Sequence, residues 1–315
     1  MARRVLIIAN PAAGRIRRHN EARLRRVVAA LEKRGCQVVV RQTQGPGDAE
    51  CLARTADVAF DVIVAAGGDG TVNEVVNGLC PTSRPLAVVP LGTGNVLANE
   101  IGMPHAPEAL ARVIAEAPAR PVWLGVAGDR LFVAMAGVGF DAEVLGAVEA
   151  GLKRRIGKLA FVWAIFLCLL HYRRRELVVG MAGGEQRAAS VVVVTGRRYA
   201  GNFVIAPAAR LAEPMLHVVL FRRPGRRAAL RGLAAMVLAA LHRLPDVSIF
   251  AVRSLTIAAV DSSSGKPPIE IDGELAGTLP IAIGIAKAPL LLLQPPTQVN
   301  PGSWEPCRAR TCFTP

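Results

Sequence analysis

One segment combines glycines with polar side chains of the types that phosphate chemistry requires. Residues 67–74 read Gly-Gly-Asp-Gly-Thr-Val-Asn-Glu and follow an expected strand at 61–65. Glycines let the backbone turn tightly against a ligand, and the first turn of a following helix offers its N–H groups to an anion. Asp69 would repel a phosphate unless a cation such as Mg²⁺ lay between them. The simpler interpretation is a strand-to-helix turn in which Asp69 and Thr71 cap the helix.

Two further polar loops that contain glycine favour the phosphate interpretation. Asn10-Pro-Ala-Ala-Gly14 follows the apolar run 5–9, and Pro90-Leu-Gly-Thr-Gly-Asn95 follows the run 86–89. Because ligands of parallel sheets bind at the carboxyl ends of the strands, we expect all three loops to meet at one edge. The sequence contains neither the Gly-Lys-Ser/Thr phosphate loop nor Gly-x-Gly-x-x-Gly. The predicted phosphate site therefore belongs to another class.

A further candidate lies far downstream, at Asp272-Gly273-Glu274. Ile269 and Ile271 are spaced as in a strand, so the acidic residues are expected in a turn at the strand end. A carboxylate there could accept the proton of a hydroxyl group during phosphoryl transfer. The alternative is a hairpin turn with exposed charges.

The elements that must position these residues change in character near residue 121. Before it, apolar runs alternate with helical periodicity, which predicts a doubly wound parallel α/β domain. After it, strand-like runs predominate, which predicts a mainly antiparallel β-sandwich domain. We expect domains at 1–122 and 123–288, a strand at 289–294 that returns to the first domain, and an unstructured tail at 295–315. The expected helices are 20–34, 48–56, 71–79, one from 93, 142–172 and 226–243, and the expected strands are 5–9, 38–40, 61–65, 86–89, 131–134, 177–181, 190–195, 216–221, 254–260, 269–271 and 290–293.

Five motifs occur together in an order that resembles the catalytic domain of the diacylglycerol kinase family. That family includes bacterial soluble lipid kinases and the sphingosine and ceramide kinases, and GGDGT alone is shared with NAD kinases. The motifs are NPAAG at 10–14, GGDGTVNEVVNGL at 67–79, PLGTGNVLANEIG at 90–102, AGVGFDAEV at 136–144 and IDGE at 271–274.

The resemblance implies an NAD-kinase-like nucleotide domain, a lipid-substrate domain and transfer of the ATP γ-phosphoryl group to a lipid hydroxyl with Mg²⁺. Asp272 is then the expected general base, Glu274 the other candidate, and Asp69 the carboxylate beside the phosphates and the catalytic metal. The expected nucleotide-binding residues are Asn10, Pro11, Gly14, Thr43, Gly67, Gly68, Asp69, Gly70, Thr71, Asn73, Glu74, Gly92, Thr93 and Asn95.

The resemblance also implies a structural Mg²⁺ near a segment that matches residues 211–216. By position Arg210, Glu213 and Met215 would contact this ion, the outer two through their carbonyl groups. The segment departs from the family pattern, because Glu213 replaces an aspartate and Pro214 a glycine. The sequence leaves open whether the site persists.

The composition points to an anionic partner. The chain has 38 Lys and Arg against 24 Asp and Glu, a net charge of +14. For a lipid kinase the expected partner is an anionic membrane surface. The longest apolar run, 159–170, is shorter than the roughly 20 residues of a membrane span, so we expect a cytoplasmic protein with transient membrane association. The segment 153–175 is either an interfacial element or a core helix of the second domain.

Two rival functions stay open at this stage. NAD kinase would use the same glycine loop on a different acceptor. Nucleic-acid binding would explain the charge, but the sequence has only 9 Phe, 3 Trp and 2 Tyr and no recognised binding module, so no nucleic acid is expected. The sequence does not select among diacylglycerol, sphingoid base, ceramide and phosphatidylglycerol, and a homodimer is one of the oligomeric states it allows.

Overall fold

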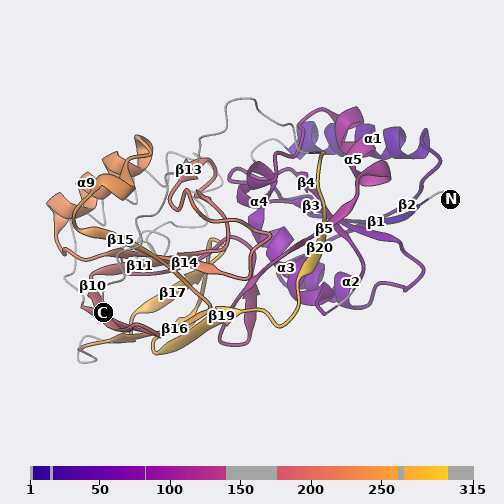
Figure 1. The fold of residues 1–315 in the computed structure, drawn as a ribbon. Helices are drawn as coiled ribbons and strands as arrows, with labels where there is room; N and C mark the ends of the chain where they lie inside the picture. The colour runs from indigo at the N-terminus through magenta and orange to yellow at the C-terminus, as the bar shows by residue number, and fades with distance from the viewer. Residues whose placement is uncertain (1–2, 15–16, 82, 140–175, 262–265, 297–315) are drawn as a thin grey trace.

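The computed structural model describes residues 3–14, 17–81, 83–139, 176–261 and 266–296. These residues form an N-terminal α/β domain and a C-terminal antiparallel β domain (Figure 1). The predicted fold class is confirmed. The predicted helix 142–172 lies outside the described residues. Within the described part of the chain, no helix has the length and apolar character needed to cross a bilayer.

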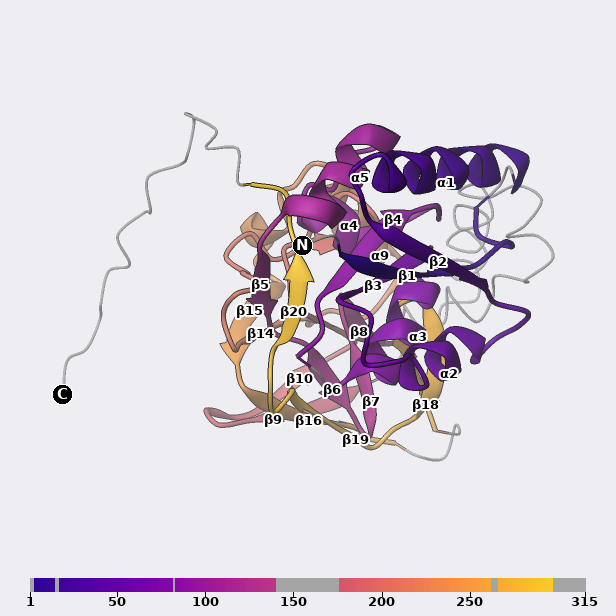
Figure 2. The same ribbon diagram turned by 90° about the vertical axis from the view of Figure 1, so that its right-hand side faces the viewer.

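The first domain is built on a six-stranded sheet in the order β2-β1-β3-β4-β20-β5. β1, β3 and β4 are almost wholly buried, because helices cover both faces of the sheet and exclude water from either side. Helices α1 and α5 pack on one face, α2 and α3 on the other (Figure 2). The elements are β1 (Arg4–Ala9), α1 (Arg17–Glu32), β2 (Gln37–Gln42), α2 (Asp48–Arg54), β3 (Val62–Gly67), α3 (Asp69–Leu79), β4 (Leu86–Pro90), α4 (Val96–Glu100), α5 (Pro107–Glu116), β5 (Ala119–Val122) and β20 (Leu290–Leu293).

The last described strand returns to the first domain. β20 lies parallel to β4 and antiparallel to β5, between the two. Leu290, Leu292 and Leu293 are buried in the core of the first domain. The chain therefore enters the second domain after β5 and comes back, so that two crossings join the domains.

The second domain is a sandwich of two six-stranded sheets. The sheet β10-β9-β16-β19-β6-β7 packs against the sheet β15-β14-β11-β8-β17-β18. Its strands are β6 (Gly125–Ala127), β7 (Arg130–Phe132), β8 (Met135–Val138), β9 (Leu177–Met181), β10 (Gly184–Ala188), β11 (Ser190–Val194), β14 (Leu216–Phe221), β15 (Val247–Val252), β16 (Ser254–Ala259), β17 (Pro268–Ile271), β18 (Glu274–Thr278) and β19 (Ile281–Ile285).

The sheet that carries β11 and β14 is covered on its outer face as well. Val191 and Val193 point into the sandwich core, whereas Val192 and Val194 belong to a separate apolar cluster on the other face. That cluster includes residues of helix α9 (Arg226–Val237), the 3₁₀ turn η1 (Leu241–Arg243) and β12 (Arg198–Tyr199), which pairs with β13 (Phe203–Val204). The continuous valine run of β11 is thus explained by burial on both faces.

Three predicted elements differ from the structure. The expected strand 131–134 is interrupted, because the backbone N–H groups of Val133 and Ala134 bind a carboxylate. The helix expected from residue 93 begins only at Val96, because Asn95 has a left-handed backbone conformation. The helix expected at 226–243 ends at Val237, and a separate 3₁₀ turn follows.

Candidate active site

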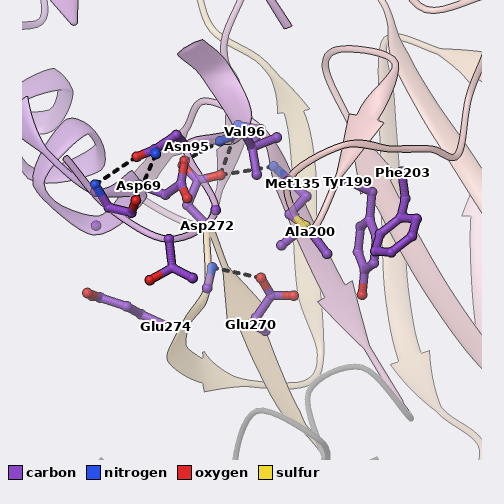
Figure 3. Close-up of a pocket in the computed structure, with 18 of the residues that line it drawn as sticks. Asp69, Asn95, Val96, Met135, Tyr199, Ala200, Phe203, Glu270, Asp272 and Glu274 are labelled. Atoms are coloured by element: carbon purple, nitrogen blue, oxygen red, sulfur yellow. Dashed lines mark hydrogen bonds between the residues drawn. The ribbon is translucent and has the colours of Figure 1, made fainter. Parts of the chain in front are cut away.

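A cavity of about 1510 Å³ is lined by both domains. At one end lie the three glycine-bearing loops that follow β1, β3 and β4. At the middle lie carboxylates from the β17–β18 hairpin, and at the other end lie apolar side chains of β13, β14 and α9. Figure 3 shows the carboxylates and aromatic side chains that face this space. Polar and apolar ligand groups could therefore be bound in one continuous site.

The first loop is held in place by its own asparagine. The Asn10 Oδ1 atom accepts a hydrogen bond from the Ala12 N–H at 2.8 Å, and Asn10 Nδ2 donates to Thr71 Oγ1 at 3.1 Å. Gly14 has a φ of +75°, and a Cβ there would lie 2.4 Å from the Leu91 carbonyl oxygen. The loop after β1 is thus packed directly against the loop after β4.

The second and third loops also touch, through two glycines. A Cβ on Gly92 would lie 2.5 Å from the Cα of Gly68, so neither loop leaves room for a side chain there. Gly68 is the N-cap of helix α3, whose first-turn N–H groups and positive dipole end favour an anion. The glycines of the two motifs are therefore required by the contact between the loops as well as by access to a ligand.

Asn95 and Asp69 shape the third loop. Asn95 exchanges two hydrogen bonds with the backbone of Gly92 and has a φ of +50°. Asp69 Oδ1 accepts the backbone N–H of Val96 at 2.6 Å. The carboxylate of Asp69 is thus fixed at the meeting point of the loops after β3 and β4.

The environment of Asp69 alters its acidity. Burial raises the pKa of this carboxyl group to about 6, and the nearby charge of Asp272 acts in the same direction. The backbone hydrogen bond from Val96 opposes the rise. A cation beside Asp69 would favour the ionised form.

Asp272 is the most tightly bound carboxylate of the site. Its Oδ1 accepts the N–H groups of Ala134 and Met135 at 2.8 and 2.9 Å. Its Oδ2 accepts Asn73 Nδ2 at 2.8 Å and the Val133 N–H at 2.7 Å. Asn73 lies on α3, so this carboxylate joins the two domains.

Opposing effects act on the protonation of Asp272, which is 6% exposed. Burial raises its pKa above the usual value, and the hydrogen bonds from Val133, Met135, Ala134 and Asn73 oppose this rise without cancelling it. All four partners are N–H donors, so a proton on either oxygen would displace one of them. The donor geometry therefore favours the ionised carboxylate, against the effect of burial, and we take this form as the resting one.

The β17–β18 turn is a hairpin in which both central residues, Asp272 and Gly273, have positive φ. The hairpin interpretation of Asp-Gly-Glu is thus correct for the backbone, although Asp272 is buried rather than exposed. Glu274 is exposed, and its Oε1 lies 2.7 Å from where a Cβ on Gly70 would stand. It therefore lies directly against the first turn of α3.

Glu270 is a further cavity carboxylate that the sequence analysis did not single out. It is 2% exposed, and its Oε1 accepts the Gly273 N–H at 2.8 Å. Ile269 and Ile271 point into the sandwich core, so the alternation of a strand places Glu270 and Asp272 together on the cavity side. That alternation was the available signal.

Most of the predicted nucleotide residues line the cavity, and two do not. Gly67 lies at the end of β3 against Thr71, and Asn73 lies beneath Asp272. Glu74 lines the cavity, but its Oε2 also accepts the Ala49 N–H at 3.0 Å and so ties α3 to α2. Those that line it are Asn10, Pro11, Gly14, Thr43, Gly68, Asp69, Gly70, Thr71, Glu74, Gly92, Thr93 and Asn95, together with the predicted catalytic residues Asp69, Asp272 and Glu274.

The three residues of the implied structural Mg²⁺ site share one turn outside the cavity. The Arg210 carbonyl accepts the Glu213 N–H at 3.0 Å, and the Glu213 carbonyl accepts the Met215 N–H at 2.8 Å. The Arg210 guanidinium donates to the Pro207 and Ala209 carbonyls. Among the residues that the structure describes, no group of three or more His, Cys, Asp or Glu could hold a metal. A cation here would have to rely on one carboxylate and backbone carbonyls.

The sequence analysis also did not identify the apolar end of the cavity. Tyr199 and Phe203 come from the β12–β13 pair, Phe221 from β14, and Leu233 and Met236 from α9. These residues are separated by up to 37 positions and carry no shared spacing, so only the folded sheet and helix bring them together.

Two family descriptions match the chain in succession. "Diacylglycerol kinase catalytic domain" matches residues 4–127, and "YegS C-terminal NAD kinase beta sandwich-like domain" matches residues 134–302. Together they cover both domains of the structure.

Similar proteins match most of this chain. A diacylglycerol kinase from Bacillus subtilis is 32% identical over 286 residues, which is 88% of this chain and 92% of the relative. A "Probable lipid kinase YegS-like" protein from Chromohalobacter salexigens is 31% identical over 259 residues, 80% of this chain and 82% of the relative. The crystal structure of a diacylglycerol kinase from Bacillus anthracis aligns with a TM-score of 0.72 at 23% identity, over 93% of this chain and 97% of that one.

Proposed function

Because the chain belongs to the family defined by the diacylglycerol kinase catalytic domain, a family of lipid kinases, we propose that it transfers the ATP γ-phosphoryl group to a lipid hydroxyl. The observation that carries the proposal is the continuity of the cavity. Glycine-bearing loops line one end, carboxylates the middle and apolar side chains the other end. A phosphate donor, a reacting hydroxyl and a hydrocarbon chain need these three surfaces in this order.

In this proposal ATP lies at the rim of the first domain. The N-terminus of α3 and the backbone of the loops after β1 and β4 face its phosphates, where N–H groups and the helix dipole favour negative charge. The contacts of Gly14 with Leu91 and of Gly68 with Gly92 keep the rim preorganised. Orientation and electrostatic stabilisation account for most of the catalysis of phosphoryl transfer.

Mg²⁺ fits the donor set of the cavity. Mg²⁺ prefers oxygen ligands and is commonly held by one or two carboxylates together with substrate phosphates. Asp69 would be the protein ligand at the rim, and the bound ion would neutralise charge that develops on the phosphates. Asp69 already lies against Gly94, where a Cβ would come within 2.6 Å of its Oδ2, so its orientation is restricted before any ligand binds.

Asp272 is our first candidate for the group that accepts the hydroxyl proton. Its ionised resting form is competent for this role, and the substrate hydroxyl would replace one of its four N–H donors. Glu274 is the second candidate, since it lines the cavity from the same hairpin and is exposed. The two differ in burial, which makes them separable by mutation.

The test is transfer of labelled γ-phosphate from ATP with Mg²⁺. Mixed micelles would present diacylglycerol, a sphingoid base, ceramide and phosphatidylglycerol in parallel, and NAD⁺ would be offered in solution. A phosphorylated lipid supports the proposal and identifies the acceptor. Labelled NADP⁺ would contradict the lipid assignment while keeping the phosphate site, and no product from any acceptor would contradict the proposal as a whole.

A further inference from the structure

The outer face of helix α9 is unusual for a surface helix. Leu230, Val237 and the C-cap residue Leu238 are 51, 60 and 76% exposed, and they are among the most exposed large apolar residues of the described chain. Leu230, Ala234, Val237 and Leu238 follow the i, i+4, i+7, i+8 spacing of a single helix face. An apolar stripe of this kind marks a surface that meets a partner or a membrane.

The same helix forms a wall of the cavity with its inner face. Ala229, Gly232, Leu233 and Met236 line the cavity, and Gly232 lies against the Phe221 ring. Val237 both lines the cavity and is exposed. On the facing side, Phe203 of β13 lines the cavity and is 39% exposed. The cavity therefore reaches the surface where α9 and β13 lie next to each other, at a rim of exposed apolar side chains.

The exposed charge around this rim is mainly positive. The segment 222–243 contains six arginines and no acidic residue, and one of the six, Arg231, pairs with the buried Asp246. Arg223 lines the cavity, and Arg226 and Arg227 begin α9 beside it. An apolar stripe flanked by arginines is complementary to the surface of an anionic bilayer, in which apolar groups enter the acyl boundary and cations remain among the headgroups.

We propose that the exposed face of α9, with the β13 rim, docks on an anionic membrane and admits the lipid substrate at the rim that α9 and β13 form. This inference rests on the proposed lipid kinase function and adds the route of its substrate. The carboxylates lie three strand spacings from β14 on the same sheet, in the order β17-β8-β11-β14, which is about 14 Å. A lipid would thus enter with its hydroxyl foremost, and its chain would extend along the apolar end toward the bilayer.

The test uses two exposed leucines that do not line the cavity. The double variant Leu230→Glu with Leu238→Glu should bind sedimented vesicles of phosphatidylcholine and phosphatidylglycerol about tenfold or more weakly than the parent chain, because two apolar contacts are lost and two negative charges added. Its turnover of a short-chain diacylglycerol below the micelle concentration should be unchanged. The matched control is Val58→Glu with Val260→Glu, which changes two exposed valines elsewhere (90 and 47% exposed) and should bind as the parent does.

A second variant tests the charge. Arg227→Glu should weaken vesicle binding most at low salt and should have little effect on neutral phosphatidylcholine vesicles, because it removes an attraction that salt screens. Equal binding of the double variant and the parent would overturn the inference, as would failure of the parent chain to sediment with anionic vesicles. A loss of self-association in the double variant, with vesicle binding intact, would instead assign α9 to a second copy of the chain and would also overturn it.

The outcomes separate this inference from the function it rests on. If short-chain lipid is phosphorylated but the α9 substitutions do not change vesicle binding, the results support the proposed kinase activity and contradict the proposed docking face. If the α9 substitutions weaken vesicle binding but no lipid is phosphorylated, the results support the docking face and contradict the proposed kinase activity. Thermal unfolding of each variant, compared with the parent, checks that the substitutions leave the fold intact.

Discussion

The two sides of the cavity are held together in different ways. On the first domain, much of each loop is held by partners within the loop, as when Asn95 bonds Gly92 three residues away or Asn10 bonds Ala12 two residues away. On the second domain, Asp272 bonds groups that lie 137 to 199 positions away in the chain. Local contacts leave a motif in the sequence, and long-range contacts do not. The comparison explains why the phosphate rim is recognisable from sequence and the environment of Asp272 is not.

The largest effect is expected from a substitution in the second domain, where Asp272 makes long-range hydrogen bonds. In Asp272→Asn an amide NH₂ would replace one carboxylate oxygen and face two N–H donors. We expect the free energy of unfolding to fall by about 2–4 kcal/mol, because buried N–H groups lose their acceptor, together with loss of turnover. Denaturant unfolding and the transfer assay measure the two effects. Unchanged stability would show that the four hydrogen bonds are not essential to the joint between the domains.

The pH dependence of stability tests Asp69 at the boundary of the two sides. The pKa of Asp69 is about 6 in the folded chain, above the usual 3.8. The folded state therefore keeps a proton that the unfolded state releases, and stability falls by about 2–3 kcal/mol as the pH rises from 4 to 6. Unfolding measured across this range without metal or nucleotide should show the fall, and Asp69→Asn should reduce it; Asp272, whose pKa is also raised, accounts for any remainder. The same slope in both proteins would assign the effect to another group.

A smaller effect is expected from a substitution in the glycine-bearing loops of the first domain. In Gly92→Ala the new Cβ would lie 2.5 Å from the Gly68 Cα, so the loops after β3 and β4 must separate. We expect about 1–3 kcal/mol of destabilisation and weaker ATP binding, measured by thermal unfolding and calorimetry. Gly183→Ala is the matched control, since nothing lies within 4 Å of its Cβ position. Equal ATP affinity for both variants would argue against a preorganised rim.

The smallest effect is expected at Glu274, and it sharpens the assignment of the base. Glu274→Gln changes an exposed side chain, so stability should stay within about 0.5 kcal/mol of the parent. If Asp272 is the base, turnover should fall by less than about tenfold, since general bases contribute roughly 10²–10⁴-fold. A loss of a hundredfold or more with an unchanged unfolding curve would transfer the role to Glu274.

Sequence periodicity and turn chemistry were sufficient for the fold class and for the rim. Apolar runs of four or five residues between amphipathic helices predict buried parallel strands, and glycine-bearing loops after those strands predict the edge at which they meet. The structure places Asn10, Gly68, Asp69, Thr71 and Asn95 along that one cavity. The strands, helices and turns that form this edge depend on residues close together in the chain, so their pattern can be read from the sequence.

Tertiary structure alone decided the environment of the carboxylates and the route into the cavity. The interruption of the strand predicted at 131–134 follows from Asp272, which draws the N–H groups of Val133 and Ala134 out of the ladder. Asn73 belongs to the glycine-bearing motif at 67–79, so the sequence placed it among the nucleotide-binding residues. Its side chain instead donates a hydrogen bond to Asp272 of the second domain. Leu230 and Leu233 lie three residues apart on α9, and only the packing of that helix on its sheet turns one outward and the other into the cavity. Hydrogen bonding and burial between distant segments depend on how the sheets stack, and no local pattern of residues encodes that.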